Sequence, residues 1–198
     1  MSLPWPTPPY VKKIQQHPAE LLEFIKFIRD RDIRSYLEIG CKYGGSLWTV
    51  AHAMSTKGRV VAVDLPHGHW GRSDSEVPLR ECVNELQRKG YDAHLFIGDS
   101  TDVNIIAKVQ ALAPFDCVFI DANHTEIYVR SDFTNYGRLA RYCCFHDIGW
   151  NNPTLPGKLP IEVPKVWAEL KETFKNQAGF REIKHDNGHN GIGIIKWH

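Results

Sequence analysis

The chain has 198 residues, of which 42% are hydrophobic and 24% charged, and 24 Lys and Arg against 23 Asp and Glu give a net charge of +1. This composition is typical of one globular domain and excludes a disordered chain, a collagen-like fibre and a coiled coil. We see no basic stripe of the kind that marks nucleic-acid binding and no apolar run near the ~18 residues needed to span a bilayer, so we expect neither nucleic acid nor a membrane as a partner.

The first ten residues are rich in proline and lack the basic and apolar segments of a signal peptide, so we expect an irregular arm. The five cysteines are an odd number without a C-x-x-C pair, and most lie in apolar runs. This pattern favours buried, reduced thiols and a cytoplasmic location. The adjacent Cys143 and Cys144 are expected to be buried in a strand and unreactive.

Residues 18–31 have apolar side chains at helical spacing, and Pro18 suits the first turn of a helix. The sequence does not decide whether this helix covers its own sheet or that of a second copy, so a homo-oligomer stays open. We expect residues 1–32 to form the arm and this helix, and residues 33–198 to form one domain.

Short apolar runs then alternate with longer segments of helical pattern. A run that is apolar nearly throughout is typical of a strand covered on both faces, as in a parallel sheet. Regular alternation with helices indicates an open α/β sheet with right-handed crossovers. The expected strands are 35–39, 59–64, 93–97, 116–121 and 142–146, and the expected helices are 45–56, 75–89, 102–111 and 125–139.

The end of the chain departs from this alternation. We expect an amphipathic helix at 162–176 and then two strands, 179–184 and 191–197, with Asn187-Gly188 as a hairpin turn signal between them. The sequence therefore predicts an α/β fold, a Rossmann-like, doubly wound, mostly parallel seven-stranded sheet with a C-terminal antiparallel hairpin.

In such a sheet, ligands bind beyond the carboxyl ends of the strands, where the strand order reverses. The first strand ends in a glycine-rich turn that starts at Gly40 and lets the backbone approach a ligand; Lys42 breaks the dinucleotide pattern G-x-G-x-x-G. Asp64 closes the second strand, where a carboxylate can accept both hydroxyls of a ribose. Asp99 follows the third strand and either binds an adenine amino group or caps the helix that starts near Asp102.

Taken in order, Glu38-x-Gly40 with Gly44-Gly45, then Asp64, then Gly98-Asp99 resemble the motifs of class I S-adenosylmethionine (SAM)-dependent methyltransferases. The resemblance covers residues 33–198, and it implies that family's seven-stranded sheet and SAM as the cofactor. It assigns these residues to cofactor binding: Glu38, Gly40, Cys41, Tyr43, Gly44, Ser46, Asp64, Leu65, Asp99, Ser100 and Asp121.

The next two strand ends carry Asp121, with His124 three residues later, and His146-Asp147. This pattern is similar to a small-molecule O-methyltransferase branch that includes macrolide-sugar and cephalosporin-pathway enzymes and is related to catechol O-methyltransferases. The resemblance implies a hydroxyl of a small molecule or sugar as the methyl acceptor. The family's usual Pro-Gly-Gly before the fifth strand is replaced by residues 140–143, so this turn must be made differently.

Some of these relatives bind a divalent cation through an acid from each of the two strand ends. Asp121 and Asp147 would end neighbouring strands ~5 Å apart, and such carboxylates repel unless a cation, a proton or a base lies between them. Asp121, Asp147 and His146 are therefore candidate metal ligands, for Mg²⁺ with the carboxylates alone and for a softer metal with an imidazole. The alternative is that the two acids hold loops by hydrogen bonds.

The candidate catalytic residues are His124, His146 and Asp121, since a histidine near the acceptor can take its hydroxyl proton at neutral pH. Strand alternation predicts that the adjacent His146 and Asp147 point to opposite faces of the sheet. After the second strand we expect residues 67–72 to form a loop over the cofactor, with Trp70 over its adenine. Residues 150–164 are expected to form a lid on the acceptor side.

The sequence thus predicts transfer of a methyl group from SAM to a substrate oxygen by in-line displacement, in which the chain aligns the reacting groups and helps remove a proton. Three alternatives stay open: a partner protein that binds SAM or S-adenosylhomocysteine (SAH) without turnover, a dehydrogenase and a metal-dependent hydrolase. The absence of G-x-G-x-x-G argues against the dehydrogenase.

Overall fold

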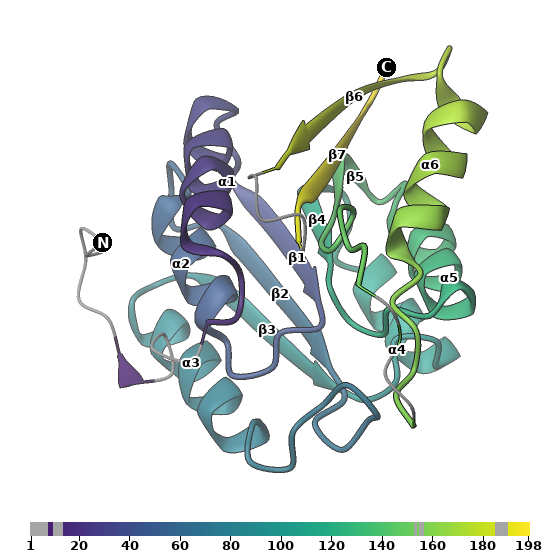
Figure 1. Ribbon diagram of the computed structural model, residues 1–198. Helices are drawn as coiled ribbons and strands as arrows, with labels where there is room; N and C mark the ends of the chain where they lie inside the picture. Colours follow the sequence, from purple (N-terminus) through teal and green to yellow (C-terminus); the bar gives the residue numbers. More distant parts are fainter. Residues whose placement is uncertain (1–7, 10–13, 153, 155–156, 185–189) are drawn as a thin grey trace.

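In the computed structural model, which describes residues 8–9, 14–152, 154, 157–184 and 190–198, seven strands form one sheet in the order β3-β2-β1-β4-β5-β7-β6 (Figure 1). The first five strands pair in parallel, and β7 pairs antiparallel with both β5 and β6. The strands are β1 Ser35–Ile39, β2 Arg59–Asp64, β3 Asp92–Ile97, β4 Phe115–Ile120, β5 Ala140–Phe145, β6 Ala178–Ile183 and β7 Ile192–Trp197. The predicted fold class is confirmed.

Six helices in these described ranges connect the strands and cover the sheet. Figure 1 shows α1, α2 and α3 on one face, and α4, α5 and α6 on the other. Their bounds are α1 Pro18–Asp30, α2 Gly45–Ala53, α3 Glu76–Arg88, α4 Val103–Gln110, α5 Glu126–Tyr136 and α6 Val163–Phe174. Each predicted element is present, with ends shifted by at most a few residues.

The core consists of two apolar layers, one on each face of the sheet. In β4, Phe119 packs in the layer under α1 to α3, whereas its neighbours Val118 and Ile120 pack in the layer under α4 to α6. Successive side chains of a strand point to opposite faces, so a strand covered on both faces must be apolar throughout. This double burial is why β1, β2, β4 and β5 were recognisable as apolar runs, whereas β3, at the edge of the sheet, is only partly buried.

Helix α1 covers its own sheet, which settles the alternative left open by the sequence. The ring of Phe24 lies 5.1 Å from that of Phe119 in β4, and Phe27 meets Tyr142 of β5 edge-on at 5.1 Å. Aromatic pairs with this spacing stabilise a core beyond the area that they bury. A homo-oligomer and the division of the chain at residue 32 stay predictions.

The turn before β5 is made without the Pro-Gly-Gly of the resembled family. Gly137 follows α5, and its carbonyl accepts a hydrogen bond of 2.8 Å from Trp197 Nε1. A Cβ at Gly137 would lie 2.6 Å from the Phe133 carbonyl oxygen, so the close approach requires glycine. The predicted turn at Asn187-Gly188 lies outside the described residues, although the β6–β7 pairing on either side of it is confirmed.

All five cysteines are free and buried, and Cys143 and Cys144 lie within β5 as predicted. Burial raises the pKa of both thiols well above the usual value, which disfavours the reactive thiolate. None of the described helices is long and apolar enough to cross a membrane.

Candidate active site

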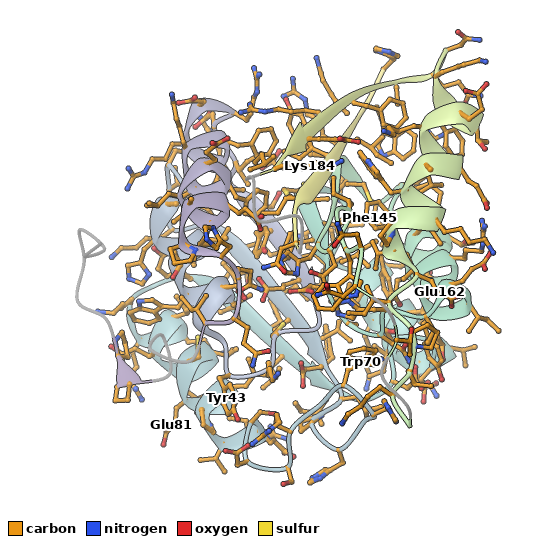
Figure 2. The ribbon with its side chains drawn as sticks, in the orientation of Figure 1. Tyr43, Trp70, Glu81, Phe145, Glu162 and Lys184 are labelled. Atoms are coloured by element: carbon orange, nitrogen blue, oxygen red, sulfur yellow. The ribbon has the colours of Figure 1, made fainter. Side chains whose placement is uncertain are left out.

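A cavity of about 660 Å³ lies at the carboxyl ends of the parallel strands, where the strand order reverses between β1 and β4. This is a volume typical of pockets for small ligands and cofactors. Its wall is built from the loops that follow β1 to β5 and from residues 14–16 before α1. Figure 2 shows Tyr43 and Trp70 on two of these loops, at the edge where β1 to β4 end.

The loop after β1 is shaped by two glycines in the left-handed region, Gly40 at φ 90° and Gly44 at φ 81°. A Cβ on Gly40 would lie 2.3 Å from the Asp121 carbonyl oxygen, so this glycine allows the ends of β1 and β4 to meet. A Cβ on Gly44 would lie 2.9 Å from Cys82 of α3. Gly40 lines the cavity, whereas Gly44 starts α2 and lies behind the lining residues.

Glu38 is fully buried in β1 and is not among the residues that line the cavity. Its carboxyl group accepts hydrogen bonds of 2.6 Å from the hydroxyls of Tyr36 and Ser46. Burial raises the pKa of Glu38 to about 8, although these hydrogen bonds oppose the shift. Glu38 therefore supports the loop through Ser46, which does line the cavity, instead of lining it itself.

Asp64 connects β2 to the glycine loop and keeps one oxygen free. Its Oδ2 accepts hydrogen bonds of 2.7 Å from the backbone N–H groups of Cys41 and Lys42. Its Oδ1 is buried and has no hydrogen-bond partner among the described residues. Burial raises the pKa of Asp64, while the two N–H donors lower it. Asp64 lines the cavity, so this unpaired oxygen is a candidate acceptor for a hydroxyl donor from a ligand.

The loop after β3 places Asp99 and Ser100 in the cavity wall. Asp99 Oδ1 accepts hydrogen bonds of 2.8 Å from the backbone N–H and the hydroxyl of Thr101. Asp99 is not the cap of α4: the side chain of Asp102 has that role and accepts from Asn104 N–H. The Tyr136 hydroxyl of α5 donates a hydrogen bond to the Ser100 carbonyl and so ties the loop after β3 to α5.

Beyond β4 and β5, two histidines and two aspartates form a compact cluster. His146 Nδ1 lies 3.1 Å from Asp121 Oδ1 and 3.3 Å from Asp147 Oδ1. His124 Nδ1 lies 2.9 Å from Asp147 Oδ2, a close contact that is not aligned as a hydrogen bond, and His124 Nε2 lies 3.6 Å from Asp121 Oδ1. All four side chains are about nine-tenths buried, and the imidazoles lie between the carboxylates.

The expectation that His146 and Asp147 point to opposite faces is wrong. Both line the cavity and contact each other. Strand β5 ends at Phe145, and Asp147 adopts a left-handed φ of 60°, so the alternation of an extended strand no longer applies there.

Two residues near the start of α1 belong to the cluster and were not predicted. Gln16 Nε2 donates a hydrogen bond of 2.7 Å to Asp121 Oδ2. Glu20 is 1% exposed, and its Oε2 lies 4.0 Å from His146 Nε2. The signal available in the sequence was Glu20 itself, a charged residue on the same helical face as Phe24 and Ile28.

The mutual contacts of the cluster shift the pKa values of His146 and Asp121 in opposite directions. Burial alone would lower the pKa of His146, but Asp121, Asp147 and Glu20 raise it to about 9, so the ring is positively charged at neutral pH. Burial alone would raise the pKa of Asp121, but His146, His124 and Gln16 lower it below its usual value. Asp121 therefore stays ionised and is paired with a charged histidine.

The candidate metal ligands do not fit a bound cation in this arrangement. Asp121 and Asp147 each have both oxygens within 3.3 Å of a side-chain nitrogen. Within the described part of the chain, no group of three or more His, Cys, Asp or Glu side chains is arranged so that it could hold a metal ion. A cation, a proton or a base between the two acids would relieve their repulsion. In this structure a base, His146, lies against both of them.

The loop after β2 also reaches the cluster. The ring of Trp70 lies 4.8 Å from that of His124, and its Nε1 donates to Asn123 Oδ1 at 3.1 Å. These contacts place Trp70 beside His124, and the expectation that it covers the adenine stays a prediction. Leu65, His69 and Trp150 also line the cavity.

Pro153, Leu155 and Pro156 of the expected lid lie outside the described residues, so the lid stays a prediction.

Comparison with known proteins points to one class. A family model described as a methyltransferase domain matches residues 37–148, which is more than half of the chain. A search of the curated proteins returns no match.

Solved structures with the same fold include O-methyltransferases at low sequence identity. An O-methyltransferase from Bacillus cereus in complex with SAH matches with a TM-score of 0.67 at 16% identity, covering 96% of this chain and 84% of that one. TomG from Streptomyces achromogenes, an O-methyltransferase involved in tomaymycin synthesis and bound to SAM, matches with 0.65 at 21% identity, covering 98% and 92%. A structure from Staphylococcus aureus that is described as a caffeoyl-CoA O-methyltransferase matches with a TM-score of 0.68 at 15% identity, covering 95% of this chain and 88% of that one.

Proposed function

The chain belongs to the methyltransferase domain family, and we propose that it transfers a methyl group from SAM to a hydroxyl oxygen of a small-molecule or sugar acceptor. One observation carries the proposal. A single cavity of about 660 Å³ joins an unpaired, buried carboxylate oxygen at the end of β2 to a cluster of histidines at the ends of β4 and β5. The first feature suits a nucleoside cofactor and the second suits removal of a proton.

The residues present fit the cofactor. Asp64 would accept a ribose hydroxyl, because it lines the cavity and its Oδ1 has no hydrogen-bond partner among the described residues. Asp99 and Ser100 would flank the adenine, and the loop from Gly40 to Ser46 would surround the methionine end. SAM supplies a methyl group already activated on a sulfonium, so the chain has mainly to align it with the acceptor oxygen and exclude water.

His124 is the base in this proposal. His146 already carries a proton at neutral pH, because its pKa is about 9, and it cannot take another. His124 lines the cavity and has Asp147 close to its Nδ1, so Nε2 can accept the proton of the acceptor hydroxyl. His146 keeps Asp121 ionised and in position, and Trp70 packs against His124 and limits its rotation.

No step in this mechanism passes through a divalent cation. The carboxylate oxygens of Asp121 and Asp147 already face side-chain nitrogens, which leaves no set of donors for a metal within the described chain. The five buried, free cysteines support a reducing compartment such as the cytoplasm.

Calorimetric titration with SAH tests the cofactor half of the proposal. We expect saturable binding by the wild type and strong weakening by Asp64→Asn, since the amide leaves one oxygen in place of two. Asp116→Asn is a matched control, because Asp116 hydrogen-bonds Ser35 at the other end of the sheet. Failure of the folded wild type to bind SAM or SAH would refute the methyltransferase proposal.

A panel of hydroxylated acceptors, assayed for SAH release, tests the chemical half. His124→Gln should lower kcat by roughly 10²- to 10⁴-fold while SAH affinity is retained, the usual contribution of a general base. His94→Gln, in β3, serves as the control. Turnover should be equal with Mg²⁺ and with chelator. Binding of SAH without turnover of any acceptor would favour the non-catalytic partner protein.

A further inference from the structure

The charge of the cavity wall is strongly one-sided. Four carboxylates line it, those of Asp64, Asp99, Asp121 and Asp147. Among the described residues that line it, Lys42 is the one lysine or arginine. The charge of His146 is already paired with Asp121, so an anionic group that enters this cavity is repelled by the acids and has Lys42 as its unpaired cationic partner.

Lys42 lines the cavity and is partly buried. It lies in the glycine loop after β1 with a left-handed φ of 49°, and its N–H is fixed by Asp64 Oδ2 at 2.7 Å. Its Nζ donates a hydrogen bond of 2.6 Å to the side-chain oxygen of Gln15. No salt bridge joins Nζ to an acid within 4.0 Å in the described structure, so the ammonium has a neutral partner only. Burial and nearby Arg72 lower the pKa of Lys42, while attraction by Asp121, Asp64 and Asp74 opposes this shift.

The methionine end of SAM carries an ammonium and a carboxylate. The cavity acids suit the ammonium and the sulfonium, but they oppose the carboxylate. An ionised carboxylate removed from water needs a charged or hydrogen-bonding partner. The glycine loop is also the part of the site that surrounds this end of the cofactor in the proposed function, on which the present inference rests.

We propose that Lys42 binds the methionine carboxylate of SAM and thereby sets the preference of this site for an amino-acid-bearing cofactor. Gln15 reaches the same ammonium from the segment before α1, so that the bound carboxylate is held between the glycine loop and the start of the chain's first helix. Lys42 is thus a binding residue and takes no part in proton removal.

The test is calorimetric titration, without acceptor, of SAH and of its decarboxylated analogue, which keeps the adenosine, the thioether and the amino group. The wild type should bind SAH roughly ten- to a hundred-fold more tightly than the analogue, the usual value of a hydrogen bond between charged groups. Lys42→Met should weaken SAH by that factor and leave the analogue unchanged. Lys42→Arg should keep most of the preference. Lys108→Met, which removes an exposed lysine of α4, should change neither affinity.

The outcomes separate this inference from the proposed function. If the wild type binds SAH but Lys42→Met weakens both ligands equally, or neither, the Lys42 assignment is overturned and the cofactor site stands. The same holds if the wild type does not discriminate between the two ligands, in which case Lys42 is free to bind an anion on the acceptor. If the folded wild type binds neither ligand, the proposed function itself falls. Thermal unfolding of each variant verifies that it is folded.

Discussion

Replacing Glu38 by glutamine should make the stability of the protein less dependent on pH. Glu38 is fully buried, and its partners are the hydroxyls of Tyr36 and Ser46. Burial raises its pKa from 4.5 to about 8, so the folded protein holds a proton on this carboxyl that the unfolded chain releases above pH 4.5. The stabilisation is full below pH 4.5 and is lost as the pH rises towards 8.

The size of the effect follows from the two pKa values. Each pH unit between them costs the wild type ~1.4 kcal/mol of unfolding free energy. Glutamine has the same shape, offers a hydrogen bond to each hydroxyl and does not titrate. Between pH 5.5 and 7.5, the difference in unfolding free energy between the two proteins should therefore shift by ~2.5 kcal/mol in favour of Glu38→Gln.

Urea unfolding at half-unit pH steps from 5.5 to 8.5 measures this difference, because contributions from other titrating groups are common to both proteins and cancel. Glu81→Gln, on the exposed side of α3, is the matched control and should follow the wild type (Figure 2). Parallel profiles for the wild type and Glu38→Gln would refute the reasoning, since they would mean that Glu38 is ionised in the folded protein throughout this range.

Two further predictions concern the same edge of the sheet. Gly40→Ala places a Cβ 2.3 Å from the Asp121 carbonyl oxygen at a φ of 90°, and should cost about 2–5 kcal/mol in urea unfolding, whereas Gly179→Ala, with no atom near its Cβ, should cost less than about 1 kcal/mol. An equal cost at both positions would contradict the close approach of β1 and β4. Burial raises the pKa of Asp132 in α5 from 3.8 to about 7, so wild-type stability falls as the pH rises between these values. The stability of Asp132→Asn relative to wild type should therefore improve by ~2 kcal/mol from pH 5.5 to 7, and a constant difference would show that Asp132 is ionised when folded.

The sequence predicted the elements because their burial leaves local signals. Strands β1 and β2 were predicted with the bounds that the structure has, since residues packed on both faces are apolar throughout. The starts of β4 and β5 were placed one and two residues late, respectively, because Phe115 and Ala140 adjoin loop residues. The site could be predicted in the same way wherever a motif marks a strand end, as at Asp64 and Asp121.

Three features of the site were decided by packing between distant segments. Glu38 and Gly44 belong to the motif of the resembled family, yet both lie behind the cavity wall, since the pattern does not say which side of the chain faces a ligand. Trp70 lies against His124 and donates to Asn123, because the course of its loop depends on contacts with residues 53 positions further along the chain. Gln16 and Glu20 reach Asp121 and His146 only once α1 has docked on the sheet.

By itself, then, the sequence determined the α/β class, the order of the elements and the acids at the strand ends, because local periodicity and chain order set these features. The tertiary structure alone decided the charge state of the site. Whether two acids at neighbouring strands are separated by a cation, a proton or a base depends on side chains that approach from other elements. Here the left-handed backbone at Asp147 turns it towards His124 and His146, and burial among three carboxylates keeps His146 charged.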